Sequence, residues 1–500
     1  MGIVIRQSFK ASIVSYFAVG VGAINILFVS TKYLNPDQLA LARILLENSL
    51  IFASFAHLGT PFISNKFFVF FKDEKKHHHN FLAFLLTLPI IGLGLFVGFY
   101  LLFQDVIVEY FSRNAAPLAK YYLLCIPLTI CWVYVLVLES YIRNHARIVV
   151  PTFIKEVYLK TTNVGLIIVF GLGWLSFEWM LYGIIGTYFG AVIILIGYIK
   201  HLKKWFIKFD LSIYKSIYVK QMIYYGLFII IGGVGQNLVL FIDRVMLASE
   251  SNLTNASIFI IAAYIASVIE IPKKTIIQIS IPIISEAIEL NQKEKMRELY
   301  HKIALNQLVA TGLLFLGIWC SIDELLSLLP KADIYGQGKL VILVVGIAKL
   351  IDIALGPGAE FVLYSRHYRF ITLLIIPIAA LNVLLNYMLI PLYQYNGAAF
   401  ATFSVTLVYG AIRVGYFWAK FKIPFLQKNY LWLLGLLVFT WYVSTLIPVI
   451  GSGFTGKVIT IIVKSVWVVV AYLGLVLYLK LSPDLNQLVL RIWRKISLKK

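Results

Sequence analysis

The sequence is poor in charged residues and in cysteine. Only 13% of its 500 residues are charged and only three are cysteines, whereas 60% are hydrophobic. Cys125, Cys131 and Cys320 show no metal-ligand spacing, and residues 77–79, all histidine, are typical of a solvated polar loop, so no metal site and no disulfide framework is expected. No nucleophile, metal or phosphate-loop motif stands out, so neither an enzyme nor a cofactor is expected.

Long apolar runs fill the rest of the chain. A bilayer is crossed by about 17–25 apolar residues in a helix, and the chain contains more apolar surface than one soluble core could bury. The sequence therefore predicts an all-α membrane protein. Its expected spans number about fourteen and lie near residues 10–31, 41–66, 81–103, 119–141, 150–171, 176–199, 222–247, 254–279, 303–321, 340–364, 370–390, 394–419, 430–449 and 457–480.

Acidic residues are scarce beside basic ones, 23 against 44, which leaves a net charge of +21. If the N-terminus is cytoplasmic, the inward loops and tails hold about 28 of the basic residues and the outward loops about six. The excess therefore predicts orientation, with both termini cytoplasmic, rather than a nucleic-acid partner. The basic stretch 200–220 and the tail 485–500 are typical of helices on an anionic membrane surface, with docking of a soluble partner as the alternative.

Spans one to six and seven to twelve can be aligned as two halves of the hydropathy pattern, as expected for repeats in transporters. An even number of spans in each half predicts two six-helix lobes related by a pseudo-two-fold axis along the membrane normal, with two further helices after them. The expected parts are an N-terminal lobe at 1–199, a basic cytoplasmic linker at 200–221, a C-terminal lobe at 222–419, spans thirteen and fourteen within 430–480, and a basic tail at 481–500.

Apart from lysines at the very ends of the predicted spans, ten cations lie inside them, where a charge costs about 2.5–3.5 kcal/mol and needs a partner, a cavity or a helix end. They are Arg43, Lys66, Lys155, Lys160, Arg244, Lys273, Lys274, Lys349, Arg413 and Lys464. Four of them are the best candidates for extending to the headgroups: Lys66, Lys273, Lys274 and Lys464.

The candidates for a cationic cavity that binds an anionic cargo are Arg43, Lys155, Lys160, Lys349 and Arg413. Arginine and lysine both suit phosphate, through a bidentate fork or a point charge. The alternative for each is an internal salt bridge. The pairs within helical reach are Arg43 with Glu47, Lys155 or Lys160 with Glu156, and Lys349 with Asp352.

Four acids inside spans could couple transport to H+ or Na+: Asp352, Glu360, Glu270 and Asp243. A desolvated carboxyl can bind and release a proton near neutral pH. Asp352 is the first choice because it lies just before Gly356-Pro357-Gly358, which predicts a break in span ten. Asp243 is next to Arg244, so a structural ion pair between them is the alternative.

Spans eleven and twelve contain the most specific motif. Asn382 and Asn386 are four residues apart and share one helix face, and Pro391 is expected to end that helix. Gly397 and Ala398 then begin a small-residue surface that allows two helices to approach closely in lipid. The motif therefore predicts a helix-packing hairpin.

This hairpin resembles the polysaccharide-export branch of the multidrug/oligosaccharidyl-lipid/polysaccharide (MOP) exporter superfamily. Residues 34–38 resemble that family's first outer turn, residues 241–244 its span-seven Asp-Arg pair, and the prolines of 271–282 its eighth span. The resemblance implies a two-lobed fold like that of the MATE transporters.

The implied function is a flippase that moves undecaprenyl-diphosphate-linked oligosaccharide across the bacterial inner membrane by alternating access. The cargo would be an O-antigen, capsule or exopolysaccharide repeat unit, passed from the cytoplasmic to the periplasmic leaflet during lipopolysaccharide or other polysaccharide biosynthesis. Membrane lipids and other polysaccharide-assembly proteins are the further partners expected.

Three other functions fit the sequence less well. A membrane glycosyltransferase or polymerase needs a catalytic group on a sizeable outer loop, but the longest outward segments, near 104–118 and 322–339, are short. A cation-coupled multidrug exporter of the same superfamily should have an acid in span one, and residues 11–31 contain none. A peptidoglycan-precursor flippase should have a Ser-Arg-x-x-Gly turn, which is absent at 31–34.

Overall fold

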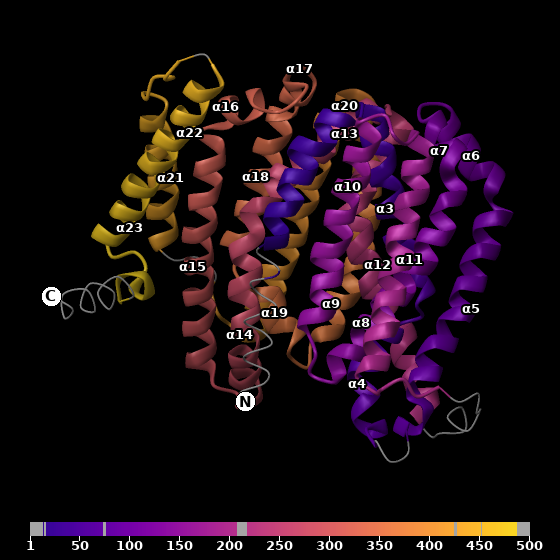
Figure 1. Cartoon of the computed structure of the whole chain (residues 1–500). Coiled ribbons are helices and arrows are strands. Elements are labelled where there is room, and N and C mark those ends of the chain that lie inside the picture. The colour runs from indigo at the N-terminus through magenta and orange to yellow at the C-terminus, as the bar shows by residue number, and fades with distance from the viewer. Residues whose placement is uncertain are drawn as a thin grey trace. The chain divides into compact units, whose positions relative to one another are not determined.

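The computed structural model describes residues 14, 17–73, 77–207, 218–424, 428–451 and 453–487. Throughout these ranges the regular structure is helical, which confirms the predicted all-α class. Compact packing divides the chain into two units, Met1–Ser257 and Ile258–Lys500, and each consists of long apolar helices (Figure 1).

Unit 1 is arranged around α8, which packs against α3, α4, α5 and α11. Its main helices are η1 (Asn25–Val29), α2 (Ser30–Tyr33), α3 (Pro36–Ala56), α4 (Thr60–Phe71), α5 (Phe81–Leu102), α6 (Gln104–Ser112), α7 (Ala116–Tyr121), α8 (Cys125–Asn144), α9 (Val149–Phe153), η4 (Ile154–Tyr158), α10 (Leu159–Gly171), α11 (Phe177–His201) and α12 (Tyr218–Glu250). Two of these, η1 and η4, are π-helical turns, a geometry that is frequent at functional sites.

The start of α3 shows how the sequence sets a helix boundary. Asn35 accepts a hydrogen bond from the Gln38 backbone N–H at 2.7 Å, and the Gln38 side chain accepts one from the Asn35 N–H at 3.1 Å. Pro36 occupies the first helical position, where its missing N–H costs nothing. The polar turn at 34–38 therefore fixes the end of the helix that holds Arg43.

Unit 2 is arranged around α15 and α20. Its main helices are α13 (Leu253–Ser267, which begins in unit 1), α14 (Ile271–Glu289), α15 (Lys293–Trp319), α16 (Ile322–Ser327), α17 (Ala332–Tyr335), α18 (Lys339–Ala354), α19 (Gly358–Leu363), α20 (Tyr368–Phe421), α21 (Lys428–Ser444), α22 (Phe454–Val468), η8 (Val469–Leu473) and α23 (Gly474–Tyr478). Helix α14 packs along α15, and α18 packs against both α15 and α20 (Figure 1).

The predicted break in span ten is confirmed. Helix α18 ends at Ala354 and α19 begins at Gly358, with Gly356 at φ +73° between them. The Tyr300 hydroxyl donates a hydrogen bond of 2.7 Å to the Leu355 carbonyl, one of the groups that the break leaves without a helical partner. Backbone that leaves the helix at membrane depth needs such protein partners.

The predicted hairpin of spans eleven and twelve lies within α20, whose 54 residues are interrupted at Gln394 with φ 53° and ψ −131°. The expectation that Pro391 ends the first helix is wrong by three residues. Proline disturbs the turn before it, but the reversal needs the positive φ that Gln394 adopts. A Cβ on Gly397 would collide with the Leu389 carbonyl, so the expected close approach is present.

Ten described helices are long and apolar enough to cross a membrane, and two shorter apolar helices occur at Phe17–Tyr33 and Asn429–Ser444. One of the ten is the interrupted α20, and span five is made by α9, η4 and α10 together. The described parts of the fourteen predicted spans are mainly helical, and the chain is a multi-pass membrane protein. Span two, predicted as one helix at 41–66, is instead divided into α3 and α4 by a turn at 57–59, where Gly59 has φ +75°. The basic residues at 208–217 and 488–500, and those at 1–13, lie outside the described residues.

Helix α12, the predicted seventh span, packs against α3 and α4 within unit 1. Its Asn237 side chain donates a hydrogen bond of 2.5 Å to the Ser54 hydroxyl of α3. The first compact unit therefore ends at residue 257, whereas the lobes predicted from the hydropathy pattern are divided at 200–221. The repeat-based lobe boundaries stay a prediction.

Candidate functional site

Glu47 on α3 contacts two cations in unit 1. Its Oε1 accepts a hydrogen bond from Arg244 Nη1 on α12, and Arg43 Nε lies 4.0 Å from the same oxygen. Within the described residues, the other oxygen, Glu47 Oε2, is buried without a hydrogen-bond partner, and so are Arg43 Nε and Arg244 Nε. One carboxylate therefore serves two guanidinium groups and leaves polar atoms on all three side chains unused.

Arg43 also lines a small, mainly apolar cavity in unit 1. Asn25 of η1 and Asn163 of α10 face the same space, whose volume is about 30 Å³. The volume accommodates about two water molecules and is too small for a phosphate group. Because the Arg43 side chain is 37% exposed, a larger anion could reach its exposed atoms.

A second carboxylate in unit 1, Glu139 on α8, also contacts two cations. Arg143 pairs with Glu139 Oε1 from one helical turn away, and Lys155 Nζ lies 3.4 Å from Glu139 Oε2. Lys160 pairs instead with Glu156 at 2.9 Å. Lys155 and Glu156 both belong to the π-helical turn η4. The sequence pattern missed Glu139, although an acid inside the fourth predicted span was a usable signal.

Asp352 is the main acid of unit 2. Its Oδ2 contacts Lys273 Nζ on α14, and its Oδ1 lies 2.9 Å from Arg413 Nη2 on α20. The same Arg413 nitrogen donates to the Asp352 carbonyl at 3.1 Å. The Arg413 side chain is 4% exposed and that of Asp352 is 17% exposed. Two cations on two other helices thus favour the ionised form of this carboxylate.

The remaining acid candidates differ in how they are paired. Glu270 and Lys349 form an ion pair at 2.9 Å. Glu360 on α19 is near Lys273 and Arg413 and interacts with both electrostatically, but the described part of the chain contains no ion pair that includes it. Asp243 on α12 is buried, with 4% of its surface exposed.

One predicted pairing is corrected by the structure. Lys349 pairs with Glu270 rather than Asp352, because a carboxylate outside its own helix lies closer than the acid within helical reach. Lys155 pairs with Glu139, and Lys160 is the partner of Glu156 that the pattern allowed. The predicted pairs of Arg43 with Glu47 and of Lys160 with Glu156 are confirmed.

Three further expectations are wrong. Lys273 and Lys464, expected to extend to the headgroups, are instead mostly buried in ion pairs. Arg244 pairs with Glu47, and a pair between Arg244 and Asp243 stays an alternative. His78, expected in a solvated loop, is 1% exposed, and the rings of Phe68, His145 and Phe206 surround it. The described residues contain no cluster of three or more potential metal ligands.

The hairpin residues serve packing. Asn382 and Asn386 are 1% and 0% exposed, and the Asn386 amide donates to the Asn382 carbonyl at 3.0 Å and to its side chain. Gly397, Ala398 and the alanines that follow are buried. The hydrogen bonds between the two amides run along one helix, as their four-residue spacing allows.

No protein-family model matches the chain, and no curated protein matches it in sequence. Its fold, however, is similar to that of solved membrane transporters. The lipid II flippase MurJ in an inward closed conformation gives a TM-score of 0.67 at 12% identity, over 93% of this chain and 99% of MurJ. An inward-facing multidrug resistance MATE family transporter of the MOP superfamily gives 0.61 at 14% identity, over 82% and 94% of the two chains.

A MOP superfamily transporter from Pyrococcus furiosus, described as having a binding pocket of reversed polarity, gives a TM-score of 0.52 at 15% identity, over 83% of this chain and 96% of that one. The likeness to these structures confirms a fold like that of MATE and MurJ. Identities this low show the fold alone, so the cargo has to be argued from the residues.

Proposed function

We propose that the chain is a MOP-type flippase that moves undecaprenyl-diphosphate-linked oligosaccharide across the bacterial inner membrane by alternating access. The observation that carries the proposal is the incomplete pairing of Arg43. Its one ion pair within the described residues, to Glu47, is 4.0 Å long, and the same carboxylate also serves Arg244. A guanidinium in a membrane segment that retains unused donors and exposed surface is suited to a passing anion.

The chemistry of a polyprenyl diphosphate fits such a group. Its diphosphate would be expensive to move through lipid alone, whereas its tail can stay in the bilayer. A cationic, hydrated surface lowers the free-energy cost of moving the diphosphate because it replaces water around the phosphate oxygens. Lys155, Lys160, Lys349 and Arg413 each have a carboxylate partner at 2.9–3.4 Å, so we rank them below Arg43 as first contacts for the cargo.

The neighbouring structures support a transporter and leave the cargo open. MurJ is a lipid II flippase, so one of these neighbours moves a lipid. In the Pyrococcus furiosus transporter, the reversed polarity of the binding pocket suggests a different function within the same superfamily. The polarity of the site around Arg43 is therefore a reasonable basis for choosing an anionic lipid over an organic cation.

The orientation and the coupling ion are part of the same proposal. The distribution of basic residues supports cytoplasmic termini. Among the acids, we place Glu360 before Asp352 as the candidate for H+, because both oxygens of Asp352 are used in ion pairs whereas Glu360 has no ion pair within the described residues. Membrane lipids and other polysaccharide-assembly proteins are the proposed partners.

The test uses purified protein in liposomes and measures how fast a fluorescent undecaprenyl-diphosphate oligosaccharide reaches the opposite leaflet. We expect Arg43→Gln to slow this flipping at least about tenfold, because a charge-assisted hydrogen bond to phosphate contributes about 1.5–3 kcal/mol. Arg43→Lys should recover part of the rate. Arg113→Gln is the matched control, since Arg113 is 75% exposed and pairs with an exposed glutamate.

The same liposomes separate the alternatives. Flipping of lipid II in preference to the oligosaccharide lipid would indicate a peptidoglycan-precursor flippase. Export of a lipophilic organic cation, without flipping of either lipid, would indicate a multidrug exporter. Equal flipping by wild type and Arg43→Gln would refute the role proposed for Arg43.

A further inference from the structure

Three helical segments that follow α20 pack against α15. Helices α21 and α22 and the π-helical turn η8 share an apolar cluster with α15 that includes Leu308, Leu316, Leu433 and Tyr472. At Gly312 of α15 an added Cβ would lie 2.7 Å from the Tyr472 hydroxyl, so the two segments approach closely there. Figure 1 shows α21, α22 and α23 beside α15.

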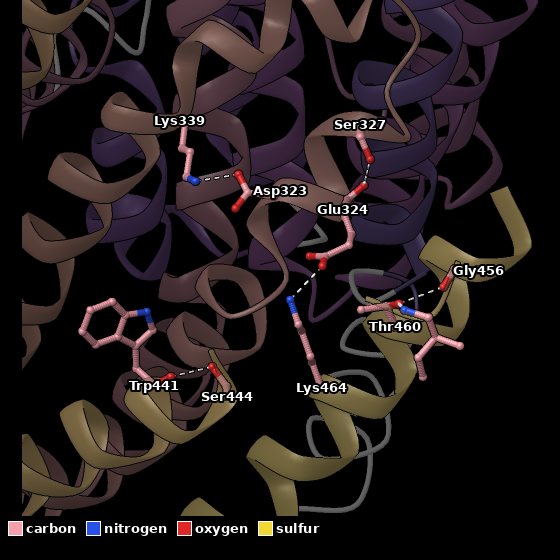
Figure 2. Close-up of polar contacts among 10 residues, drawn as sticks. Asp323, Glu324, Ser327, Lys339, Trp441, Ser444, Gly456, Thr460 and Lys464 are labelled. Carbon is pink, nitrogen blue, oxygen red and sulfur yellow. Dashed lines mark hydrogen bonds and ion pairs between the residues drawn. The ribbon is translucent and has the colours of Figure 1, made fainter. Parts of the chain in front are cut away.

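A buried ion pair joins α22 to α16 at one end of this group of helices. Lys464 Nζ of α22 lies 2.7 Å from Glu324 Oε1 of α16, the short helix that follows α15 (Figure 2). The Lys464 side chain is 12% exposed and that of Glu324 is 6% exposed. Removing either partner would leave the other as an uncompensated buried charge, which is far more costly than losing an exposed pair.

A second polar cluster joins α15 to residues 482–484 at the other end of the group. Lys302 of α15 pairs with Asp484 at 2.8 Å, and the Asn306 amide donates to the same carboxylate at 2.8 Å. Ser482 in turn donates to Asn306 at 2.8 Å. Partial burial raises the pKa of Asp484, but these hydrogen bonds outweigh it and leave the pKa below its ordinary value. The cluster thus favours the charged carboxylate that Lys302 needs.

The ion pair and the polar cluster are far apart along α15. The 17 residues from Lys302 to Trp319 rise by roughly 26 Å at 1.5 Å per residue. Apolar packing alone lets helices slide or rotate in lipid, whereas a buried polar pair has one favourable register. We infer that α15, α16 and α21–α23 move as one rigid body, and that the Glu324–Lys464 ion pair fixes the register of α22 against α15 and α16.

The chain offers a matched control next to the pair. Asp323 precedes Glu324 and pairs with Lys339 at 2.5 Å, but its side chain is 72% exposed and that of Lys339 is 43% exposed (Figure 2). Exposed ion pairs contribute little to stability. Asp323→Asn and Glu324→Gln therefore remove the same charge from adjacent positions. We expect the first change to have little effect on the packing of α22 and the second to weaken it.

Cys320 provides a local probe. It is 8% exposed, and the side chains of Ser444 and Lys464 lie near its thiol. In a full-length protein with Cys125→Ala and Cys131→Ala, Cys320 is the single thiol, and its rate of reaction with a maleimide reports how often this contact opens. The test needs no assumption about cargo, so it stands apart from the proposed function.

We expect Glu324→Gln and Lys464→Gln each to speed maleimide reaction at Cys320 at least about tenfold, and Asp323→Asn to change it less than about twofold. The apolar double variant Glu324→Leu with Lys464→Met should react more slowly than either single variant. If a Gln variant does not purify, Glu324→Asp replaces it and should react faster than the Asp323→Asn control. Equal rates in wild type and in the Glu324 and Lys464 single variants, or no recovery in the double variant, would overturn the inference.

Discussion

Glu47 in unit 1 and Asp352 in unit 2 each serve two cations, but they use their oxygens differently. Asp352 contacts Lys273 through one oxygen and Arg413 through the other. Glu47 uses Oε1 for both Arg43 and Arg244, and its Oε2 is buried without a hydrogen-bond partner in the described structure. We call the Asp352 network closed because both carboxylate oxygens have cationic partners, although Arg413 Nε is buried without a hydrogen-bond partner in the described structure, and we call the Glu47 network open because one carboxylate oxygen has none.

Because Asp352 and Glu47 use their oxygens differently, Arg413 and Arg43 should have different roles. Arg413 is 4% exposed and is held by the Asp352 carboxylate and carbonyl, so an incoming anion would have to displace both. Arg43 is 37% exposed and has only a 4.0 Å contact to give up. A cation in a closed network stabilises the fold, whereas a cation in an open network can exchange its partner for cargo.

Breaking the closed network should have the largest effect on stability. Asp352→Asn leaves Lys273 and Arg413 without an ion-pair partner among the described residues and with Glu360 as the remaining nearby acid, which should cost about 3–5 kcal/mol. Thermal unfolding in detergent measures the loss. A melting temperature equal to that of wild type would show that the pairing in unit 2 does not stabilise the fold.

Breaking the open network should cost less. Glu47→Gln keeps an oxygen that can accept from Arg244, so we expect a loss of about 1–3 kcal/mol in the free energy of unfolding. The same melting assay ranks it against Asp352→Asn. The comparison between the networks fails if Glu47→Gln is the more destabilising of the two.

Arg43→Gln should separate stability from transport. Because the Arg43 side chain is partly exposed and its ion pair is long, we expect its loss to cost less than about 1 kcal/mol of stability. Protein yield and melting temperature should stay near those of wild type while flipping falls. Parallel loss of melting temperature and flipping would indicate a structural role for Arg43.

The smallest expected effect on stability is that of Glu360→Gln, since the described residues show no ion pair for Glu360. If this carboxyl binds the coupling proton, its amide cannot titrate, and flipping should lose its response to an imposed pH gradient. The liposome assay with and without a gradient measures this response. A full response in the variant would direct the search to Glu270 and Asp243.

Local features of the fold were predictable from the sequence. The break at residues 356–358 follows from glycine and proline, whereas the one at Gln394 lies three residues beyond the proline expected to cause it. The pairs of Arg43 with Glu47 and Lys160 with Glu156 follow from helical spacing. Each depends on residues within one or two helical turns. The spans were predictable for the same reason, because each needs only its own apolar length.

Contacts between helices were not predictable in this way. Arg244 reaches Glu47 across 197 residues, and Lys464 reaches Glu324 across 140. Neither pair has a sequence spacing that marks it, because the partners meet only after the helices pack. The prediction that Lys464 extends to the headgroups was wrong for this reason, since its partner lies outside any predicted span.

The most direct test of the account is binding of a short-chain prenyl diphosphate to the purified protein, measured by calorimetry in detergent. We expect Arg43→Gln to weaken binding at least about tenfold, which corresponds to about 1.4 kcal/mol, and Arg43→Lys to weaken it less. Arg113→Gln should bind as wild type does. Equal affinities for wild type and Arg43→Gln would contradict the claim that the open network around Glu47 receives the anionic cargo.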